Sequence, residues 1–347
     1  MRIAILTDAW FPQVNGVVRT LNKTIELLQA QGHEILCINP QMFRTLPMPT
    51  YPDIRLAILP WGGVKKRLDE FQPEAVHLAT EGSIGWAGRR WCLKRKVAYT
   101  TAYHTRFPEY VRLRAPIPLS WSYAFVRRFH ASGIRTMVAT RSMHDSLKEH
   151  GFDNLVYWSR GVDLERFQPR DNPEIFKDLP RPIMLHLGRV AVEKNIQAFL
   201  ELDLPGSKVV IGDGPARKQL EAEFPEAHFL GYKENGDLAR HLSAADVLVF
   251  PSLTDTFGLV MLEANASGVP VAAFPVEGPV DVVENGVNGW VDGDLKNAVQ
   301  QALKIDRAAC RARAEQYSWD ACTQQFFDNL QPLAQADLQP ARGESAA

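Results

Sequence analysis

The sequence predicts an α/β protein made of two doubly wound domains, and three observations lead to this expectation. The chain has 347 residues, enough for two domains with separate hydrophobic cores. The N-terminus reads as a strand (2–7), a loop, a helix and a second strand (33–40), the order that opens a doubly wound sheet. After the polar, proline-rich run 169–182, the segment 183–189 (IMLHLGR) begins a second series of buried strands.

Polar residues follow the expected strands of the first half. The strand 75–79 runs into Glu81, and the strand 97–105 delivers His104 into a loop. Ligands of doubly wound sheets bind at the carboxyl ends of the strands, which makes both residues candidates to contact a substrate. A solvated surface glutamate and a structural histidine are the alternatives, and the residues themselves leave them open.

The stretch 247–274 carries the most informative pattern of the second half. Two apolar strands flank an expected helix from about Thr256 to Ser267, and Asp255 is positioned to cap it. This helix is apolar almost all round except for Glu263, and a buried carboxylate needs hydrogen-bond donors. The vicinal hydroxyls of a ribose could supply them. The alternative is that Asp255 is only a cap and that the protein itself satisfies Glu263.

Backbone and side-chain donors near this stretch suit a phosphate. Amides at a helix N-terminus are unpaired donors and favour anions or polar sugars; here they belong to Phe257, Gly258 and Leu259. Arg189 and Lys194 follow the strand 183–189, and two fixed cations can stabilise a leaving diphosphate without a metal ion. An Arg/Lys pair that only faces solvent is the plainer alternative.

Composition limits the possible partners. No apolar run approaches the length of a membrane span, and four scattered cysteines without ligand spacing indicate a reducing cytoplasm and no zinc. The net charge of −1 divides into +10 up to Arg170 and −11 beyond it. Basic residues at 65–67 and 89–96, interleaved with aromatic side chains such as Trp86 and Trp91 that look exposed, favour an anionic lipid surface. No nucleic-acid module and no dinucleotide glycine fingerprint is visible.

Several ordered motifs resemble those of one enzyme family. The stretch T-D-T-F-G-L-V followed by E-A-N-A-S-G-V-P-V closely resembles the donor-site signature of family 4 retaining glycosyltransferases. G-R-V-A-V-E-K-N (188–195), Y-H-T-R-F-P-E-Y (103–110) and the run 161–169 resemble further segments of that family. The first acid of the signature is more often Glu, so Asp255 is a departure, one seen in lipid- and mannose-transferring branches. The resemblance covers roughly residues 1 to 330.

The resemblance implies a GT-B fold, with two Rossmann-like domains facing across a cleft, and a role for each matching residue. Glu263 would hold the ribose, Arg189 and Lys194 the diphosphate, and Asp255 the sugar, so that Arg189, Lys194, Asp255 and His104 form the catalytic set. The remaining donor-binding residues it implies are Gly16, Gly212, Asp213, Tyr232, Phe257, Gly258 and Leu259. Those for the acceptor are Asn15, Glu81 and His104. No metal ion or other cofactor is expected.

The resemblance also predicts how the chain is organised. An acceptor domain would span 1–168, a donor domain 169–316, a returning helix 317–331, and a disordered tail 332–347. The implied reaction moves a sugar from a UDP-sugar or GDP-mannose to a hydroxyl of a membrane lipid such as diacylglycerol, on the inner face of the cytoplasmic membrane. A soluble, polysaccharide or lipopolysaccharide acceptor is the alternative within the class. A GT-B sugar-nucleotide epimerase and a binding-only protein are alternatives outside it.

Overall fold

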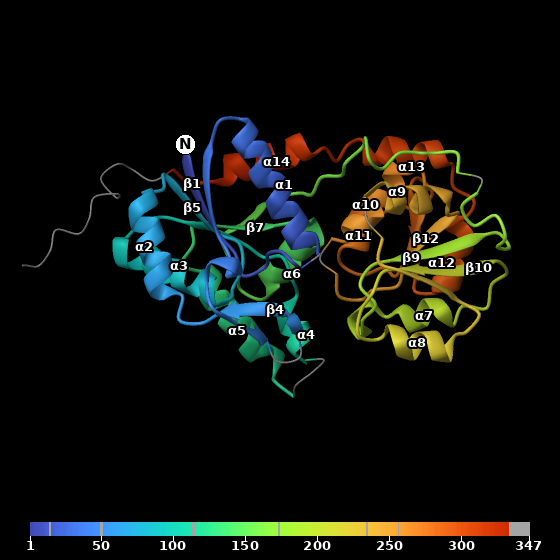
Figure 1. Cartoon of the computed structure of the whole chain (residues 1–347), viewed down its shortest axis with the longest axis horizontal. Coiled ribbons are helices and arrows are strands. Elements are labelled where there is room, and N and C mark those ends of the chain that lie inside the picture. Colours follow the sequence, from blue (N-terminus) through green and yellow to red (C-terminus); the bar gives the residue numbers. More distant parts are fainter. Residues whose placement is uncertain are drawn as a thin grey trace, which may run out of the picture. The chain divides into compact units, whose positions relative to one another are not determined.

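The computed structural model describes residues 1–13, 15–48, 51–112, 116–172, 174–233, 235–255 and 257–332. The chain divides into two units (Figure 1), one formed by Met1–Ser159 with the segment from Asp320 onward, and the other by Arg160–Trp319. The tail predicted to be disordered lies, from residue 333 onward, outside the described residues. Each unit contains its own six-stranded sheet, and every strand pair in both sheets is parallel.

The sheet of the first unit has the strand order β2-β1-β5-β6-β7-β8. Its strands are β1 (Arg2–Leu6), β2 (Glu34–Ile38), β5 (Ala75–Leu78), β6 (Thr100–Ala102), β7 (Arg135–Val138) and β8 (Leu155–Tyr157). Its helices are α1 (Gly16–Ala30), α2 (Trp61–Phe71), α3 (Ser83–Arg95), α4 (Phe107–Arg112), α5 (Leu119–His130), α6 (Arg141–Glu149) and α14 (Trp319–Asn329). A short helix, η1 (Pro40–Met42), leads into an antiparallel pair, β3 (Thr45–Met48) and β4 (Tyr51–Ala57).

The sheet of the second unit has the order β11-β10-β9-β12-β13-β14. Its strands are β9 (Ile183–Leu187), β10 (Ser207–Ile211), β11 (His228–Gly231), β12 (Val247–Phe250), β13 (Val271–Ala273) and β14 (Gly289–Val291). Its helices are η2 (Val192–Lys194), α7 (Ile196–Leu200), α8 (Arg217–Glu223), α9 (Asn235–Ala244), α10 (Leu259–Ala266), α11 (Pro279–Val282), α12 (Leu295–Ala302) and α13 (Arg307–Ala314). The doubly wound α/β prediction is therefore confirmed.

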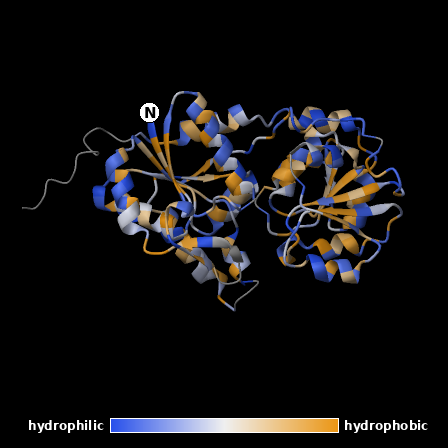
Figure 2. Cartoon of the chain, viewed as in Figure 1, coloured by the Kyte–Doolittle hydropathy of each residue, from blue (hydrophilic) through white to orange (hydrophobic). Residues whose placement is uncertain are grey.

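Both sheets are apolar on two faces, as parallel sheets covered by helices must be. The hydropathy colouring in Figure 2 shows the strands of each sheet as predominantly hydrophobic. Strands β1, β9 and β12 are buried along nearly their whole length. Strand order reverses between β1 and β5 in the first sheet and between β9 and β12 in the second. Each reversal is a topological switch point, where ligands of doubly wound sheets bind.

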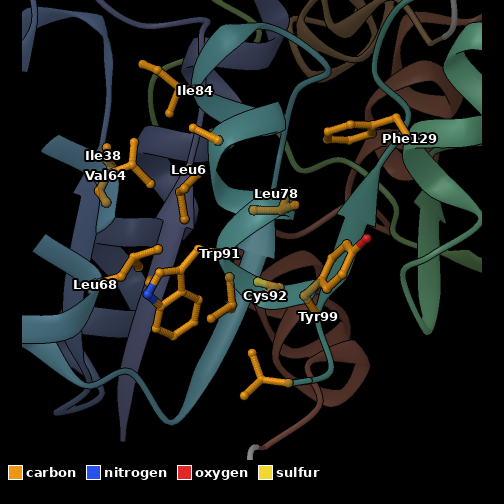
Figure 3. Close-up of a cluster of buried hydrophobic side chains, with 14 of the residues drawn as sticks. Leu6, Ile38, Val64, Leu68, Leu78, Ile84, Trp91, Cys92, Tyr99 and Phe129 are labelled. Carbon is orange, nitrogen blue, oxygen red and sulfur yellow. The ribbon is translucent and has the colours of Figure 1, made fainter. Parts of the chain in front are cut away.

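Helix α3 lies very close to the first sheet (Figure 3). A Cβ atom on Gly88 would lie only 2.5 Å from a methyl carbon of Leu6, so glycine at this position permits the approach. The approach buries Trp91, which is only 4% exposed and donates its indole N–H to Asp69 at 2.8 Å. The prediction that Trp91 is exposed was therefore wrong. The same carboxylate accepts a hydrogen bond from Arg95, so one cation of the basic stretch 89–96 is already paired with an acid of the protein.

Helix α14 packs within the first unit. Phe326 is fully buried, with its ring 4.9 Å from that of His77 and 4.8 Å from that of Trp158. Arg135 donates hydrogen bonds to two carbonyl groups at the end of this helix, each at 3.1 Å. The last described helix is thus fixed to the unit that contains the N-terminus.

Candidate active site

The switch point of the second sheet brings together the residues that follow β9 and β12. Lys194 comes after β9 and Asp255 after β12, 61 positions apart in sequence. The Lys194 ammonium group donates to both carboxylate oxygens of Asp255, at 2.5 and 2.7 Å. Burial raises the pKa of Asp255, but the charge and hydrogen bonds of Lys194 outweigh this effect, and the pKa lies below its usual value. Asp255 is therefore ionised and paired.

Arg189 has an acidic partner of its own, which the sequence analysis did not single out. Its guanidinium group donates a hydrogen bond to the carboxylate of Glu193, whose side chain is almost completely buried. Glu193 and Lys194 both belong to the short helix η2, which follows Arg189 in the chain. Asn195 closes η2 in a left-handed conformation (φ 52°) and donates to the carbonyl of Pro251 at 3.1 Å, which fixes the loop after β9 to the loop after β12.

The structure corrects the prediction that Asp255 caps a helix. Helix α10 begins at Leu259, later than expected, and its N-cap is Gly258 in a left-handed conformation with φ 81°. A side chain at this position would lie 2.8 Å from Met261 and 2.9 Å from Phe250, so both the φ angle and the packing require glycine. Asp255 lies four positions before the first helical residue and pairs with Lys194 instead.

The other predicted residues of this stretch lie on or beside α10. Glu263 is the one ionisable residue in α10 and is 7% exposed. The hydroxyl of Ser267 donates to the Glu263 carbonyl at 2.9 Å. Phe257 is buried with its ring 6.4 Å from that of Tyr317, and Leu259 is the first residue of the helix. The buried environment expected for Glu263 is therefore present.

The loop after β10 packs against the loop after β9. A Cβ atom on Gly212 would lie 1.8 Å from the carbonyl oxygen of Gly188, so only glycine fits there. Asp213 accepts hydrogen bonds from the Gly214 amide at 2.8 Å and from Arg217 at 3.1 Å, which shapes the turn before α8. Tyr232 follows the edge strand β11 and is half exposed.

Strand β9 also contains a buried histidine, close in sequence to the loop that carries Arg189 and Lys194. His186 is 1% exposed, and its Nδ1 lies 3.3 Å from the carbonyl oxygen of Val249. Burial lowers its pKa to about 4; the hydrogen bond to Val249 opposes the shift, and the charge of Lys194 adds to it. The ring is thus neutral near pH 7. The sequence alone does not show that His186 lies near Lys194, because a histidine inside an apolar strand looks like any other buried residue.

In the first unit, the switch point lies between the loops that follow β1 and β5. Asn15 caps α1 by accepting a hydrogen bond from the Val18 amide at 3.0 Å, and Gly16 is the first helical residue. The carboxylate of Asp8 accepts from the amides of Ile84 and Gly85 at the start of α3, at 2.9 and 3.2 Å. Asp8 therefore connects the loop after β1 with the helix after β5, a role the sequence analysis did not assign.

The other two acceptor candidates of the first unit, Glu81 and His104, contact residues inside that unit. Glu81 lies 2.9 Å from Nε2 of His130, whose Nδ1 lies 2.8 Å from the hydroxyl of Thr101. His130 lies on the buried side of α5. His104 follows β6, is largely buried, and has its ring 5.5 Å from that of Trp158 in an edge-to-face arrangement. Each residue thus lies at the carboxyl end of a sheet strand.

Among the described residues, no three His, Cys, Asp or Glu side chains come close enough together to hold a metal ion. Within the same part of the chain, no helix combines the length and apolar character needed to cross a bilayer.

Comparisons with known proteins identify the family. The model described as glycosyltransferase family 4 matches residues 14–166, and the model described as glycosyl transferases group 1 matches residues 167–316. A GDP-mannose-dependent alpha-mannosyltransferase of Mycolicibacterium smegmatis is 31% identical over 311 residues, which cover 82% of this chain and 82% of that protein. The chain belongs to glycosyltransferase family 4.

Two further proteins resemble this family 4 glycosyltransferase. The alpha-monoglucosyldiacylglycerol synthase of Streptococcus pneumoniae is 27% identical over 349 residues, covering 87% of this chain and 78% of that protein. The solved structure of sucrose-phosphate synthase from Thermosynechococcus elongatus superposes with a TM-score of 0.74 at 20% identity, covering 94% of this chain and 97% of that one. The predicted GT-B fold and the glycosyltransferase class are confirmed.

Proposed function

We propose that this glycosyltransferase moves a hexosyl unit from a UDP- or GDP-linked donor to a hydroxyl of a membrane lipid such as diacylglycerol, with retention of configuration. The donor would bind to the domain predicted as residues 169–316 and the acceptor to the domain predicted as 1–168. The observation that carries the proposal is the pair of cations after β9, each held in place by a carboxylate at the switch point of the sheet.

A diphosphate at this switch point would compete with the two carboxylates for the cations. Arg189 presents a planar guanidinium group and Lys194 a compact ammonium group, and both suit phosphate oxygens. We propose that Glu263 holds the ribose from α10 and that the amides of Phe257, Gly258 and Leu259 orient the sugar, with Asp255 beside them. Gly212, Asp213 and Tyr232 would complete the donor site.

The proposed reaction is a front-face substitution. The bond between the anomeric carbon and the diphosphate oxygen breaks, and the acceptor oxygen bonds to the same face of that carbon. The acceptor proton passes to the departing phosphate oxygen. Arg189 and Lys194 stabilise the charge that builds on the diphosphate, so that no metal ion is needed. Gly16, Asn15, Glu81 and His104 would align the acceptor and the reacting sugar.

The acceptor proposal rests on named relatives and on charge. One relative is an alpha-monoglucosyldiacylglycerol synthase by name. The first 170 residues carry an excess of ten positive charges, which suits attachment to the anionic inner face of the cytoplasmic membrane. We therefore expect that reversing the basic charges of residues 89–96 abolishes binding to anionic vesicles.

A panel of UDP- and GDP-sugars tests the donor assignment. The matching donor should raise the melting temperature of the full-length chain, since a ligand that binds only the folded state stabilises it. Arg189→Ala and Lys194→Ala should each reduce this shift, whereas Lys304→Ala, an exposed lysine at the end of α12, should leave it unchanged.

Turnover with the matching donor and a membrane extract then tests the transfer. The product should be a glycolipid with the anomeric configuration of the donor. Inverted product, or full turnover in the Arg189→Ala/Lys194→Ala chain, would contradict the proposal.

A further inference from the structure

The first unit contains an apolar groove between α4 and α5 that no step of the proposed reaction uses. It encloses about 190 Å³ and is lined by Phe107 and Val111 from α4, Ile117 from the connection, and Trp121, Ser122, Phe125 and Val126 from α5. Six of these seven side chains are apolar. A groove of this composition offers few hydrogen-bonding groups to a sugar and instead suits a hydrocarbon.

Helix α5 carries two large aromatic side chains on its exposed face in addition to the apolar residues on its buried face. Tyr123, Val126 and Phe129 point into the core, as expected for a helix that covers a sheet. Trp121 and Phe125, one turn apart, are 72% and 52% exposed. A helix on a water-exposed surface normally has a polar outer face. The exposed aromatic pair therefore indicates that something other than water covers this face.

Cations lie on the same elements as these aromatic side chains and on the neighbouring helix α3. Arg128 on α5 and Arg112 at the end of α4 are exposed. The ring of Phe125 lies 5.3 Å from that of Trp86 on α3, and the Arg89 guanidinium group lies 5.0 Å from the centre of the Trp86 ring. Exposed Trp and Phe next to Arg are typical of surfaces that lie in the interface of a bilayer, where rings enter the acyl region and cations meet lipid phosphates.

The basic stretch 89–96 provides no exposed aromatic side chain to such a surface. Trp91 is buried, and Trp61 on α2 lies beneath two cations, with Arg90 at 4.5 Å and Lys94 at 5.4 Å from its ring centre. This part of α3 can attract anionic headgroups. The two most exposed aromatic rings of the described residues, Trp121 and Phe125, lie on α5.

We propose that the groove between α4 and α5 takes acyl chains of an anionic bilayer, with Trp121 and Phe125 inserted into the membrane interface. The inference rests on the proposed lipid acceptor, because it supplies the surface that would bring the acceptor domain to the membrane. It assigns the apolar contact to α5 and leaves the electrostatic contact to the surrounding arginines and to α3.

The test uses the full-length chain and vesicles of phosphatidylcholine and phosphatidylglycerol at a 3:1 ratio, with and without dibrominated acyl chains. The parent chain should bind, and bromine should quench its tryptophan fluorescence. Trp121→Phe should keep binding but lose most of the quenching, since each of the other seven tryptophans, all within the described residues, is buried or partly buried. Trp121→Ser/Phe125→Ser should bind at least about tenfold more weakly, because two aromatic side chains no longer leave water.

Ile134→Ser is the matched control, since Ile134 is an exposed apolar residue beyond the opposite end of α5. It should bind as the parent does. Equal binding by the Trp121→Ser/Phe125→Ser chain, full quenching in Trp121→Phe, or a parent that ignores vesicles would overturn the proposal. So would a parent dimer that the double substitution dissociates, because a second copy would then be the occupant.

The two proposals fail in different ways. A parent chain that is stabilised by a nucleotide sugar but does not bind vesicles would overturn the groove assignment and leave the glycosyl transfer standing. A chain that inserts Trp121 into vesicles but responds to none of the UDP- or GDP-sugars would support the groove and count against the transfer.

Discussion

Replacing Lys194 by methionine should destabilise the second unit through its effect on Asp255. Methionine keeps the length of the side chain but removes the charge, which leaves the carboxylate without its cation. Removing one partner of a buried ion pair costs about 3–5 kcal/mol. The two side chains here are 20% and 17% exposed, so solvent screening reduces the expected loss to about 2 kcal/mol. For a unit of this size, this loss lowers the melting temperature by about 4–8 °C.

A double-mutant cycle separates the pair from other effects of the substitutions. Asp255→Asn removes the opposite charge, so Lys194→Met/Asp255→Asn contains no bare charge and should be more stable than Lys194→Met alone. The cycle should give a coupling energy of about 1–2 kcal/mol, measured by calorimetry at neutral pH. Lys304→Met controls for the loss of a surface charge. Strictly additive effects, or a Lys194→Met chain that melts with the parent, would refute the pairing.

Three further predictions concern pH and packing. Because the pKa of Asp255 is lower in the folded chain, its pair stabilises the fold above about pH 4 and this contribution disappears as the pH falls through the folded pKa, so the Lys194→Met chain should lose less stability on acidification than the parent. Gly212→Ala should cost more than about 2 kcal/mol and weaken donor binding, since its Cβ would clash with a backbone carbonyl, while Gly293→Ala, with nothing within 4 Å, should cost little. Asp8→Ala should cost about 3 kcal/mol and speed amide exchange at the start of α3, because two amides lose their acceptor.

The parts of the site that follow one strand could be predicted from the sequence. Arg189 and Lys194 come directly after a run of buried residues, and the rule that ligands gather at the carboxyl ends of strands places them without a structure. The buried position of Glu263 followed from a helix that is apolar all round. In both cases the signal is local, because the polar residue lies within or close after the strand or helix that predicts its position.

The features that the sequence analysis missed depend on contacts between distant segments. The pairing of Lys194 with Asp255 needs β9 and β12 to be neighbours, which the order of the strands along the chain does not specify. A capping aspartate and a lysine-paired aspartate look alike in sequence, and the left-handed Gly258 decides between them. Trp91 looked exposed because its helix is rich in arginine, but Gly88 lets that helix approach the sheet closely enough to bury it.

The carboxylate beside each cation has a consequence for the reaction. If the donor diphosphate binds these cations as proposed, it competes in the ground state with Glu193 for Arg189 and with Asp255 for Lys194, so part of the attraction between donor and cations is lost to this exchange. As the glycosidic bond breaks, the diphosphate gains negative charge and competes better with the carboxylates. We therefore propose that the cations bind the transition state more strongly than the substrate, and such a difference in binding is what accelerates a chemical step. In this proposal, Glu193 and Asp255 neutralise the cations in the absence of donor and make them selective for the leaving diphosphate.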